Sequence, residues 1–360
     1  MSFATICVAI FGPIIGTLSD FPGNKKKIFL LTALGGAGAL FFLWLPSTWY
    51  SFLFVFVLIK VLYSISLVVY DSMLIDVCDE ERMDDISSRG YAWGYLGSCV
   101  PFIISLVFIL LQPKIGISMG TIMTIVFMIN AIWWICFSLP LARHYKQKYS
   151  TKRTGAAVQQ TFKRLGNTLK ELVHQKKVMY FMIAFFFYID GVYTIIDLAT
   201  AYGTSLGLDQ TGLLLALLLT QIVAFPSAIY FGILAKKKST GSLIKVGIIA
   251  YFCIALFGLF LQYTWQFWVL AVSVGLFQGG IQALSRSYFA QIIPKNQSGE
   301  YFGLYDIAGK GASFLGTMIV GLVTQITGQQ NIAVGTLAFL FLIGLFVFSK
   351  ADKIENPVYN

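Results

Sequence analysis

Three ionisable side chains lie deep inside long apolar segments and are the first candidates for chemistry. Lys60, Asp190 and Lys310 each stand about 13–16 Å from the nearer end of such a segment, at a helical rise of about 1.5 Å per residue. A charge held at that depth in a membrane is costly, so it marks a binding site or a proton relay by default. We expect a zwitterion site, in which Lys60 or Lys310 faces a carboxylate and Asp190 faces an ammonium group or a proton.

Simpler interpretations of the same charges stay open. Asp306 lies one helical turn before Lys310, so the two can form an intrahelical pair that only neutralises both charges. Asp190 has no opposite charge three or four residues away, which favours a role with substrate, with a proton or with another helix. Lys60 can pair with Asp190 purely for stability.

Four neutral polar residues also interrupt the apolar segments: Asn130, Gln221, Gln278 and Gln282. Their side chains can line a cavity by hydrogen bonding, and we count Gln278 and Gln282 with the substrate site. Hydrogen bonding between neighbouring helices is the simpler interpretation for most of them.

The composition requires that membrane-spanning helices position these residues. Of 360 residues, 57% are hydrophobic and 12% are charged, which is too little charge to cover the surface of a soluble enzyme. A spanning helix needs about 20 mostly apolar residues, and the runs here lack the alternation of a β-barrel. The sequence therefore predicts an all-α polytopic membrane protein with eleven spans, at residues 1–19, 28–46, 51–70, 90–111, 118–140, 179–202, 212–235, 243–262, 266–291, 301–327 and 330–349.

Lysine and arginine residues predict the orientation of these spans. The formal net charge is +10, and the basic residues gather in alternate gaps such as 25–27, 143–177 and 236–238. Such gaps lie on the cytoplasmic side, which places the C-terminus there as well. With eleven spans, Met1 would then lie outside, so we expect one helix to be missing before it. Anionic lipid accounts for the basic gaps, so no nucleic-acid partner is expected.

An internal repeat supports the same count. Residues 16–20 close the first span and residues 232–236 close the seventh, and a basic turn and a new apolar run follow each. If the two halves correspond, the first span pairs with the seventh and the sixth has no partner. Two parallel six-helix repeats, the first lacking its first helix, are the layout of facilitator-type secondary transporters.

This layout predicts four parts of the chain. They are an N-terminal bundle (1–142), a basic cytoplasmic linker (143–178), a C-terminal bundle (179–350) and a cytoplasmic tail (351–360). The linker carries apolar residues at helical spacing with lysine and arginine around them. We expect an amphipathic helix there that lies on the inner leaflet and connects the two bundles.

Two sets of residues resemble known families. The pattern Gly16-x-Leu18-x-Asp20-x-x-Gly23, with basic residues after it, is similar to the loop signature that follows the second helix of the major facilitator superfamily, although Phe21 departs from the usual basic residue. Segments 187–191, 279–290, 299–306 and 309–316 resemble the vacuole-effluxer-like family within that superfamily. The resemblance implies the major facilitator fold with twelve helices, and relatives that include fungal vacuolar amino-acid effluxers.

The same resemblance implies a cytoplasmic gate that contains Gly16, Asp20, Gly23 and Arg286. In one state of such a gate a carboxylate can face the positive N-terminus of a neighbouring helix, which is the role expected for Asp20. The alternative for Asp20 is a solvated turn. The acidic loop 79–85 is expected to be solvated, although it can pair with basic loops when the cytoplasmic side closes.

Enzyme classes have little support in this sequence. The five cysteines are scattered without metal-ligand spacing, and both histidines lie in one basic loop, so no metal, cofactor or catalytic site is expected. The expected function is secondary active transport of a small solute, an amino acid by resemblance, with proton coupling left open. A membrane sensor or scaffold without turnover, and a carrier of another solute such as a sugar, also stay open. The expected location is a bacterial plasma membrane.

Overall fold

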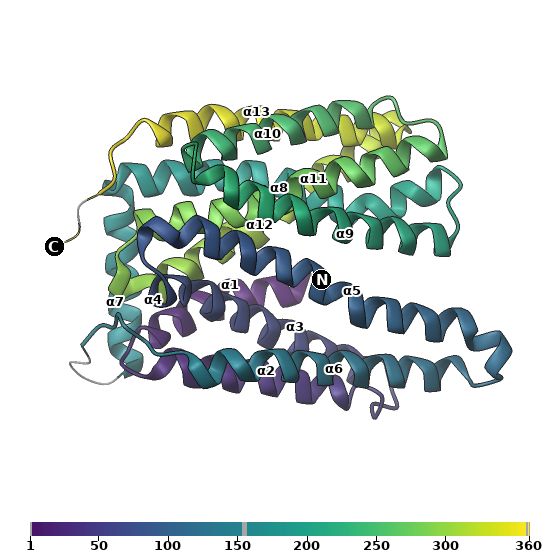
Figure 1. Ribbon diagram of the computed structural model, residues 1–360, viewed down its shortest axis with the longest axis horizontal. Helices are drawn as coiled ribbons and strands as arrows, with labels where there is room; N and C mark the ends of the chain where they lie inside the picture. Colours follow the sequence, from purple (N-terminus) through teal and green to yellow (C-terminus); the bar gives the residue numbers. More distant parts are fainter. Residues whose placement is uncertain (1, 153–156, 358, 360) are drawn as a thin grey trace. The chain divides into compact units, whose positions relative to one another are not determined.

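The computed structural model describes residues 2–152, 157–357 and 359, without the side chains of residues 2, 3, 157–160 and 310–314. All secondary structure in the described residues is helical (Figure 1). This confirms the predicted all-α class. The chain divides into two compact units, which are described separately below.

Unit 1 comprises Met1–Val77, Gly97–Asn167 and Pro294–Asp306. Its core is an apolar cluster that Phe29, Val69, Met73 and Ala142 form between the helices α2, α3 and α6. The helices that lie in unit 1 are α1 (Ser2–Ser19), α2 (Asn24–Phe41), α3 (Trp49–Ser72), α4 (Leu74–Val77), α6 (Met119–His144) and the short η2 (Lys295–Gln297).

Unit 2 comprises Cys78–Leu96, Thr168–Ile293 and Ile307–Asn360. Helices α9 and α11 pack together, and so do α8 and α13. Buried aromatic rings from α8, α11 and α13 stack near Phe181, which lies 5.2 Å from the ring of Tyr288 and 6.1 Å from that of Phe348. The helices are η1 (Glu80–Arg82), α8 (Lys176–Ser205), α9 (Gln210–Ala235), α10 (Thr240–Gly258), α11 (Thr264–Ile292) and α13 (Gln330–Asp352).

Three helices are divided between the units. Helix α5 (Met83–Ile115) belongs to unit 2 up to Leu96 and to unit 1 from Gly97. Helix α12 (Ser298–Thr327) belongs to unit 1 up to Asp306 and to unit 2 after it. The linker helix α7 (Ala157–His174) divides after Asn167. The predicted domain boundaries, which follow the chain in order, stay a prediction.

Side-chain caps and glycine turns set several helix ends. Thr48, Ser118, Asp209 and Ser239 each accept a hydrogen bond from the first turn of the helix that follows, as N-cap residues do. Between α1 and α2 the backbone of Gly23 has φ = 72°, in the left-handed region that favours glycine. The predicted role of Gly23 in this turn therefore has a local physical reason.

Each of the eleven predicted apolar segments coincides with a helix of the described residues, but α2 ends at Phe41 and α10 at Gly258, before the predicted ends at residues 46 and 262. Within the described residues, eight helices are long and apolar enough to cross a membrane. The remaining three are α1, α2 and α12, of which α2 carries three lysines in its first turn. The count of eleven spans and the helix expected before Met1 stay predictions. Helix α5 begins at Met83 rather than near residue 90, because the acidic loop continues directly into its first turn.

Candidate functional site

Asp190 lies in the middle of α8 and its side chain is fully buried. Its Oδ1 atom accepts hydrogen bonds from the backbone N–H of Gly316, at 3.0 Å, and from the hydroxyl of Thr194, at 3.2 Å. Oδ2 is buried and has no hydrogen-bond partner among the described residues. A buried carboxylate with one unsatisfied oxygen is costly, so this atom is suited to take a proton or a cationic group.

The approach of α12 to Asp190 depends on a glycine. A Cβ atom on Gly316 would collide with the Thr194 hydroxyl and lie 2.8 Å from Asp190 Oδ1. Only glycine therefore lets the backbone N–H of this position reach the carboxylate. The sequence pointed to Asp190 because of its depth, but nothing in the sequence indicated Thr194 or Gly316 as its partners.

The structure gives the burial of two other predicted charges, Lys60 and Asp306. Lys60 is half-buried on α3 in unit 1, whereas Asp190 belongs to unit 2, so their predicted pairing stays a prediction. Asp306 is half-buried on α12. Lys310 lies on the same helix, but its side chain is outside the described residues. The predicted pair of Asp306 with Lys310 is therefore untested.

Gln278 and Gln282 are both buried on α11. The hydroxyl of Tyr95, on α5, donates to Gln282 Oε1 at 2.9 Å, and Tyr95 also hydrogen-bonds with Gln278. These contacts join α5 to α11 within unit 2, which is the simpler of the two interpretations made from the sequence. Tyr95 was not indicated by the sequence, since a tyrosine in an apolar helix carries no distinctive signal.

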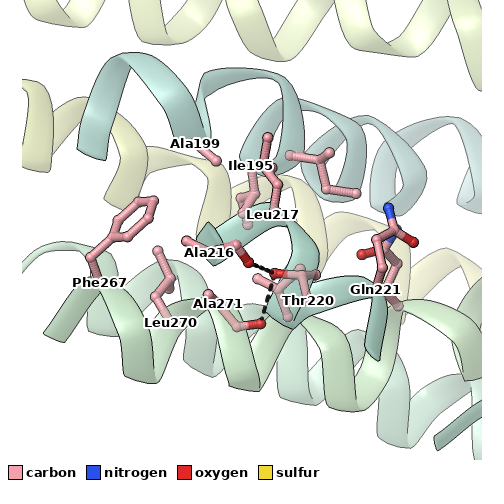
Figure 2. Close-up of a pocket in the computed structure, with 12 residues that line it drawn as sticks. Ile195, Ala199, Ala216, Leu217, Thr220, Gln221, Phe267, Leu270 and Ala271 are labelled. Atoms are coloured by element: carbon pink, nitrogen blue, oxygen red, sulfur yellow. Dashed lines mark hydrogen bonds between the residues drawn. The ribbon is translucent and has the colours of Figure 1, made fainter. Parts of the chain in front are cut away.

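A partly open pocket lies between α8, α9 and α11 in unit 2, with about 500 Å³ of space free of protein atoms when the solvent at its mouth is included (Figure 2). Apolar side chains such as Phe267 form one end, and Gln221 lies at the other. The Thr220 hydroxyl is occupied, since it donates to the carbonyls of Ala216 and Ala271 at 3.0 and 3.2 Å. Gln221 Oε1 is buried without a hydrogen-bond partner among the described residues, which leaves it free to accept from a ligand.

Asp20 holds the N-terminus of α12 within unit 1. Its two carboxylate oxygens accept from the backbone N–H groups of Gly299, at 2.8 Å, and Glu300, at 3.0 Å. This is the contact expected of a gate carboxylate at a helix N-terminus. Burial raises the pKa of the Asp20 carboxyl to about 7, and Lys25, the two N–H groups and Arg164 oppose that rise.

Arg164 of the linker helix α7 joins this contact. Its guanidinium donates to Glu300 Oε2 at 2.9 Å and lies 3.7 Å from Asp20 Oδ2. Glycines let the backbones approach, because a Cβ atom on Gly16 would overlap the carbonyl of Gly299. The predicted gate residues Gly16 and Asp20 are therefore brought together by the fold, and Arg164 was missed.

A second charged cluster in unit 1 is completely buried. Lys25 Nζ lies 2.8 Å from Asp76 Oδ2 and 2.7 Å from the hydroxyl of Ser298, at the start of α12. Asp76 also accepts from the hydroxyl of Tyr145, at 2.5 Å, and from the backbone N–H of Lys148, at 2.9 Å. The sequence indicated Lys25 as a topological charge and as one of the basic residues of the loop signature, but not as a partner of Asp76. Asp76 carried no signal because its partners are remote in sequence.

Arg286, the fourth predicted gate residue, lies in unit 2 near the end of α11. Its guanidinium donates to the hydroxyl and to the carbonyl of Ser87, both at 3.0 Å, and stacks 4.6 Å from the centroid of the Tyr91 ring. Arg286 thus anchors the first turns of α5. Among the described residues, no group of three His, Cys, Asp or Glu side chains is arranged to hold a metal ion.

Comparisons with known proteins indicate the family of this chain. A protein of Bacillus subtilis named as an uncharacterized MFS-type transporter, YxiO, is 40% identical over 353 residues, which cover 97% of this chain and 82% of that protein. Autophagy-related protein 22-1 of Aspergillus niger is 26% identical over 291 residues, and the chain spans about half the length of such fungal relatives. The first of these relatives is named as a transporter and the second as an autophagy-related protein. A transporter is not an enzyme, in agreement with the expectation from the sequence.

Solved structures show the same fold. The E. coli fucose:proton symporter FucP matches with a TM-score of 0.72 at 14% identity, over 98% of this chain and 91% of that one. The proton:xylose symporter XylE matches with a TM-score of 0.70 at 10% identity, over 96% and 84%. The family model described as "Vacuole effluxer Atg22 like" matches residues 76–353. The chain is a multi-pass membrane protein with the major facilitator fold, and it belongs to the vacuole effluxer Atg22 like family.

Proposed function

We propose that this major facilitator transporter moves amino acids across a bacterial plasma membrane by alternating access, with its C-terminus in the cytoplasm. The observation that carries the proposal is the carboxylate of Asp190, which is fully buried at mid-helix and whose Oδ2 atom has no hydrogen-bond partner among the described residues. An ammonium group that reaches Oδ2 would supply the missing hydrogen bond and neutralise the charge. A proton would do the same, and proton coupling through Asp190 is part of the proposal.

Two considerations favour an amino acid as the substrate. The chain belongs to a family described as vacuole effluxers, and its sequence resemblance to that family implies relatives that are amino-acid effluxers. The carboxylate of Asp190 is an anion suited to an ammonium group, and we keep the proposal from the sequence that Lys60 or Lys310 faces the substrate carboxylate. Lys60, Lys310 and Asp306 keep their proposed roles in substrate binding or coupling. Gln278 and Gln282 are proposed to line the route through their remaining hydrogen-bonding capacity.

The test is counterflow of a panel of labelled amino acids into proteoliposomes that contain the full chain. We expect exchange of one or a few amino acids, and at least about a tenfold loss in Asp190→Asn, because the variant cannot carry the charge that binds the ammonium group. Asp197→Asn is the matched control, since Asp197 lies on the same helix and is exposed. Its exchange should equal that of the unaltered chain.

Three outcomes would contradict the proposal. Full exchange by Asp190→Asn would remove Asp190 from the site. If no amino acid of the panel is exchanged, and the thermal midpoint shows that the protein is folded, the proposed substrate class is overturned. A panel of sugars would then be tested. Binding of a solute without exchange would indicate a sensor.

Proton coupling is tested with an imposed pH gradient. The gradient should drive accumulation of the labelled amino acid in proteoliposomes that contain the unaltered chain, and not in those that contain Asp190→Asn.

A further inference from the structure

The residues that follow α13 return to the start of α8 within unit 2. After Asp352 the chain turns, and the backbone N–H of Ile354 donates to the carbonyl of Ala351 at 3.2 Å. The carbonyl of Ile354 accepts from the side-chain ammonium of Lys177, in the first turn of α8, at 2.7 Å. The sequence indicated only a cytoplasmic tail here, so this contact between the tail and α8 was not expected.

A second contact fixes the far end of the same segment. The hydroxyl of Tyr359 donates to the carbonyl of Ile292, at the end of α11, at 2.8 Å. The same hydroxyl lies 3.3 Å from Oε1 of Gln175, the residue between α7 and α8. We call residues 353–359, which the structure describes except for residue 358, the tail strap. The tail strap joins the end of α13 to the end of α11 and to the junction of α7 with α8.

Lys177 depends on the tail strap for its hydrogen bonding. It is only 8% exposed, and among the described residues its ammonium has one hydrogen-bond acceptor, the Ile354 carbonyl. The ammonium also lies 5.5 Å from the centroid of the Tyr288 ring, where a cation–π interaction is favourable. A buried charge is costly unless it is hydrogen-bonded. Departure of the tail strap therefore forces Lys177 toward water, and this movement disturbs the first turn of α8.

The tail strap affects the start of α8 more than the end of α13. One helical turn beyond Lys177, the buried ring of Phe181 stacks on Tyr288 at 5.2 Å, so Lys177 lies at the end of the aromatic cluster of unit 2. The end of α13 has another attachment, because Asp352 Oδ2 lies 2.6 Å from Lys245 Nζ of α10. Loss of the tail strap should therefore loosen the start of α8 and leave the end of α13 in place.

We propose that the tail strap is a conformational device that stiffens the junction of α7 with α8: Lys177 and Tyr359 hold its two ends, and its release loosens the start of α8. The two ends differ in security. The Lys177 contact is buried, whereas Tyr359 is 38% exposed, so water replaces the hydrogen bonds of its hydroxyl at little cost. Release therefore begins at Tyr359.

The tail strap acts on the helix that carries the proposed substrate carboxylate. Asp190 lies farther along α8, about 20 Å from Lys177 at the helical rise of about 1.5 Å per residue. In alternating access a repeat moves largely as a rigid body, which requires its helix ends to move together. The consequence for transport rests on the proposed function, but the tail strap itself does not.

The experiment measures hydrogen–deuterium exchange of backbone amides by mass spectrometry, for the full chain and for a variant that stops after Lys353. Hydrogen exchange reports local opening, so the α7–α8 junction is measured directly. Its amides include that of Met179, which donates to the Gln175 carbonyl at 3.0 Å. We expect them to exchange about tenfold faster in the shortened variant, because a hydrogen bond to a charged group is lost. Tyr359→Phe removes only a hydroxyl and should give a smaller rise.

Two controls separate release of the tail strap from general loosening. Asn356→Ala changes an exposed residue of the tail strap itself and should leave the exchange rate of the junction unchanged. Residues 216–228, in the middle of α9, are the internal control, because α9 takes no part in the contacts described above. Their exchange rates should be the same in all variants.

The proposal is overturned if the α7–α8 junction exchanges as slowly in the shortened variant as in the unaltered chain. It is also overturned if residues 216–228 become faster to the same extent, because the change would then be loss of structure. In counterflow, the shortened variant should show a lower maximal exchange rate at an unchanged half-saturation concentration, and an unchanged rate would overturn the consequence for transport. Hydrogen exchange needs no substrate, so absence of counterflow in every chain would count against the proposed function and leave the tail strap to be judged by hydrogen exchange alone.

Discussion

The start of α12 in unit 1 and the start of α5 in unit 2 are fastened by different chemistry. In unit 1, Lys25 and Asp76 form an ion pair in which neither side chain is exposed. In unit 2, Asp85 near the start of α5 pairs with Lys236, whose side chain is 57% exposed, at a longer distance of 3.6 Å. Equal charges therefore contribute very differently to the free energy of unfolding, because a buried charge left without its partner is destabilising whereas an exposed charge is hydrated.

The sharpest test of this comparison removes one lysine from each unit. Lys25→Met leaves the Asp76 carboxylate buried without its cation, which should lower the free energy of unfolding by about 3–5 kcal/mol. Lys236→Met removes an exposed cation and should change it by about 0–1 kcal/mol. Thermal unfolding in one detergent gives both values. Equal losses of unfolding free energy in the two variants would refute the distinction between the buried Lys25–Asp76 pair of unit 1 and the exposed Lys236–Asp85 pair of unit 2.

A glycine substitution tests whether close backbone approach maintains the unit 1 contact. A Cβ atom on Gly16 overlaps the Gly299 carbonyl, so Gly16→Ala should force α1 away from α12 and cost about 1–3 kcal/mol. Gly94→Ala is the control, because nothing lies within 4 Å of the added atom, and it should stabilise the helix by up to about 1 kcal/mol. The thermal midpoints should move in opposite directions. A Gly16→Ala protein as stable as the unaltered chain would contradict the prediction.

The pH dependence of stability tests the burial of Asp20. Because burial raises its folded pKa to about 7, above the ordinary value of 3.8, the folded state binds the proton more tightly than the unfolded state. The contribution of Asp20 to the free energy of unfolding is therefore complete below about pH 4 and is lost as the pH rises through about 7. The free energy of unfolding changes over this range by at most about 1.4 kcal/mol per pH unit. Thermal midpoints between pH 5 and 8 should fall more steeply for the unaltered chain than for Asp20→Asn. Parallel pH profiles would show that Asp20 is hydrated in the folded protein.

The smallest effect is expected at a second pair in unit 2. Lys245 Nζ lies 2.6 Å from Asp352 Oδ2, but the two side chains are 28% and 22% exposed. Lys245→Met should change the free energy of unfolding by less than about 1 kcal/mol, since water hydrates the remaining carboxylate. Added salt should reduce further the difference in unfolding free energy between the unaltered chain and Lys245→Met. A loss as large as that of Lys25→Met would mean that unit 2 also depends on buried charge.

Much of the fold could be predicted because it follows from local composition. Every predicted apolar segment is helical over most of its length, and the turn at Gly23 has the positive φ that glycine adopts readily. Gly16 and Asp20, which the resemblance to a known signature marks as candidates for a gate, both contact the start of α12, and their role in a gate stays a prediction. The boundary of α5 could not be predicted, because the acidic residues that look like a loop form the first turn of a helix and accept hydrogen bonds from other helices.

The sequence by itself determined the membrane class, the helical segments and the position of Asp190 in the middle of an apolar helix, because these depend on runs of neighbouring residues. Tertiary structure alone decided what each charge faces. Asp20 meets backbone N–H groups at Gly299 and Glu300, which have no side-chain signature, and Lys25 meets Asp76 across 51 residues. A carboxylate such as that of Asp20 can be solvated in a loop or can hold the start of a helix, depending on which hydrogen-bond donors pack against it. Those donors come from distant parts of the chain.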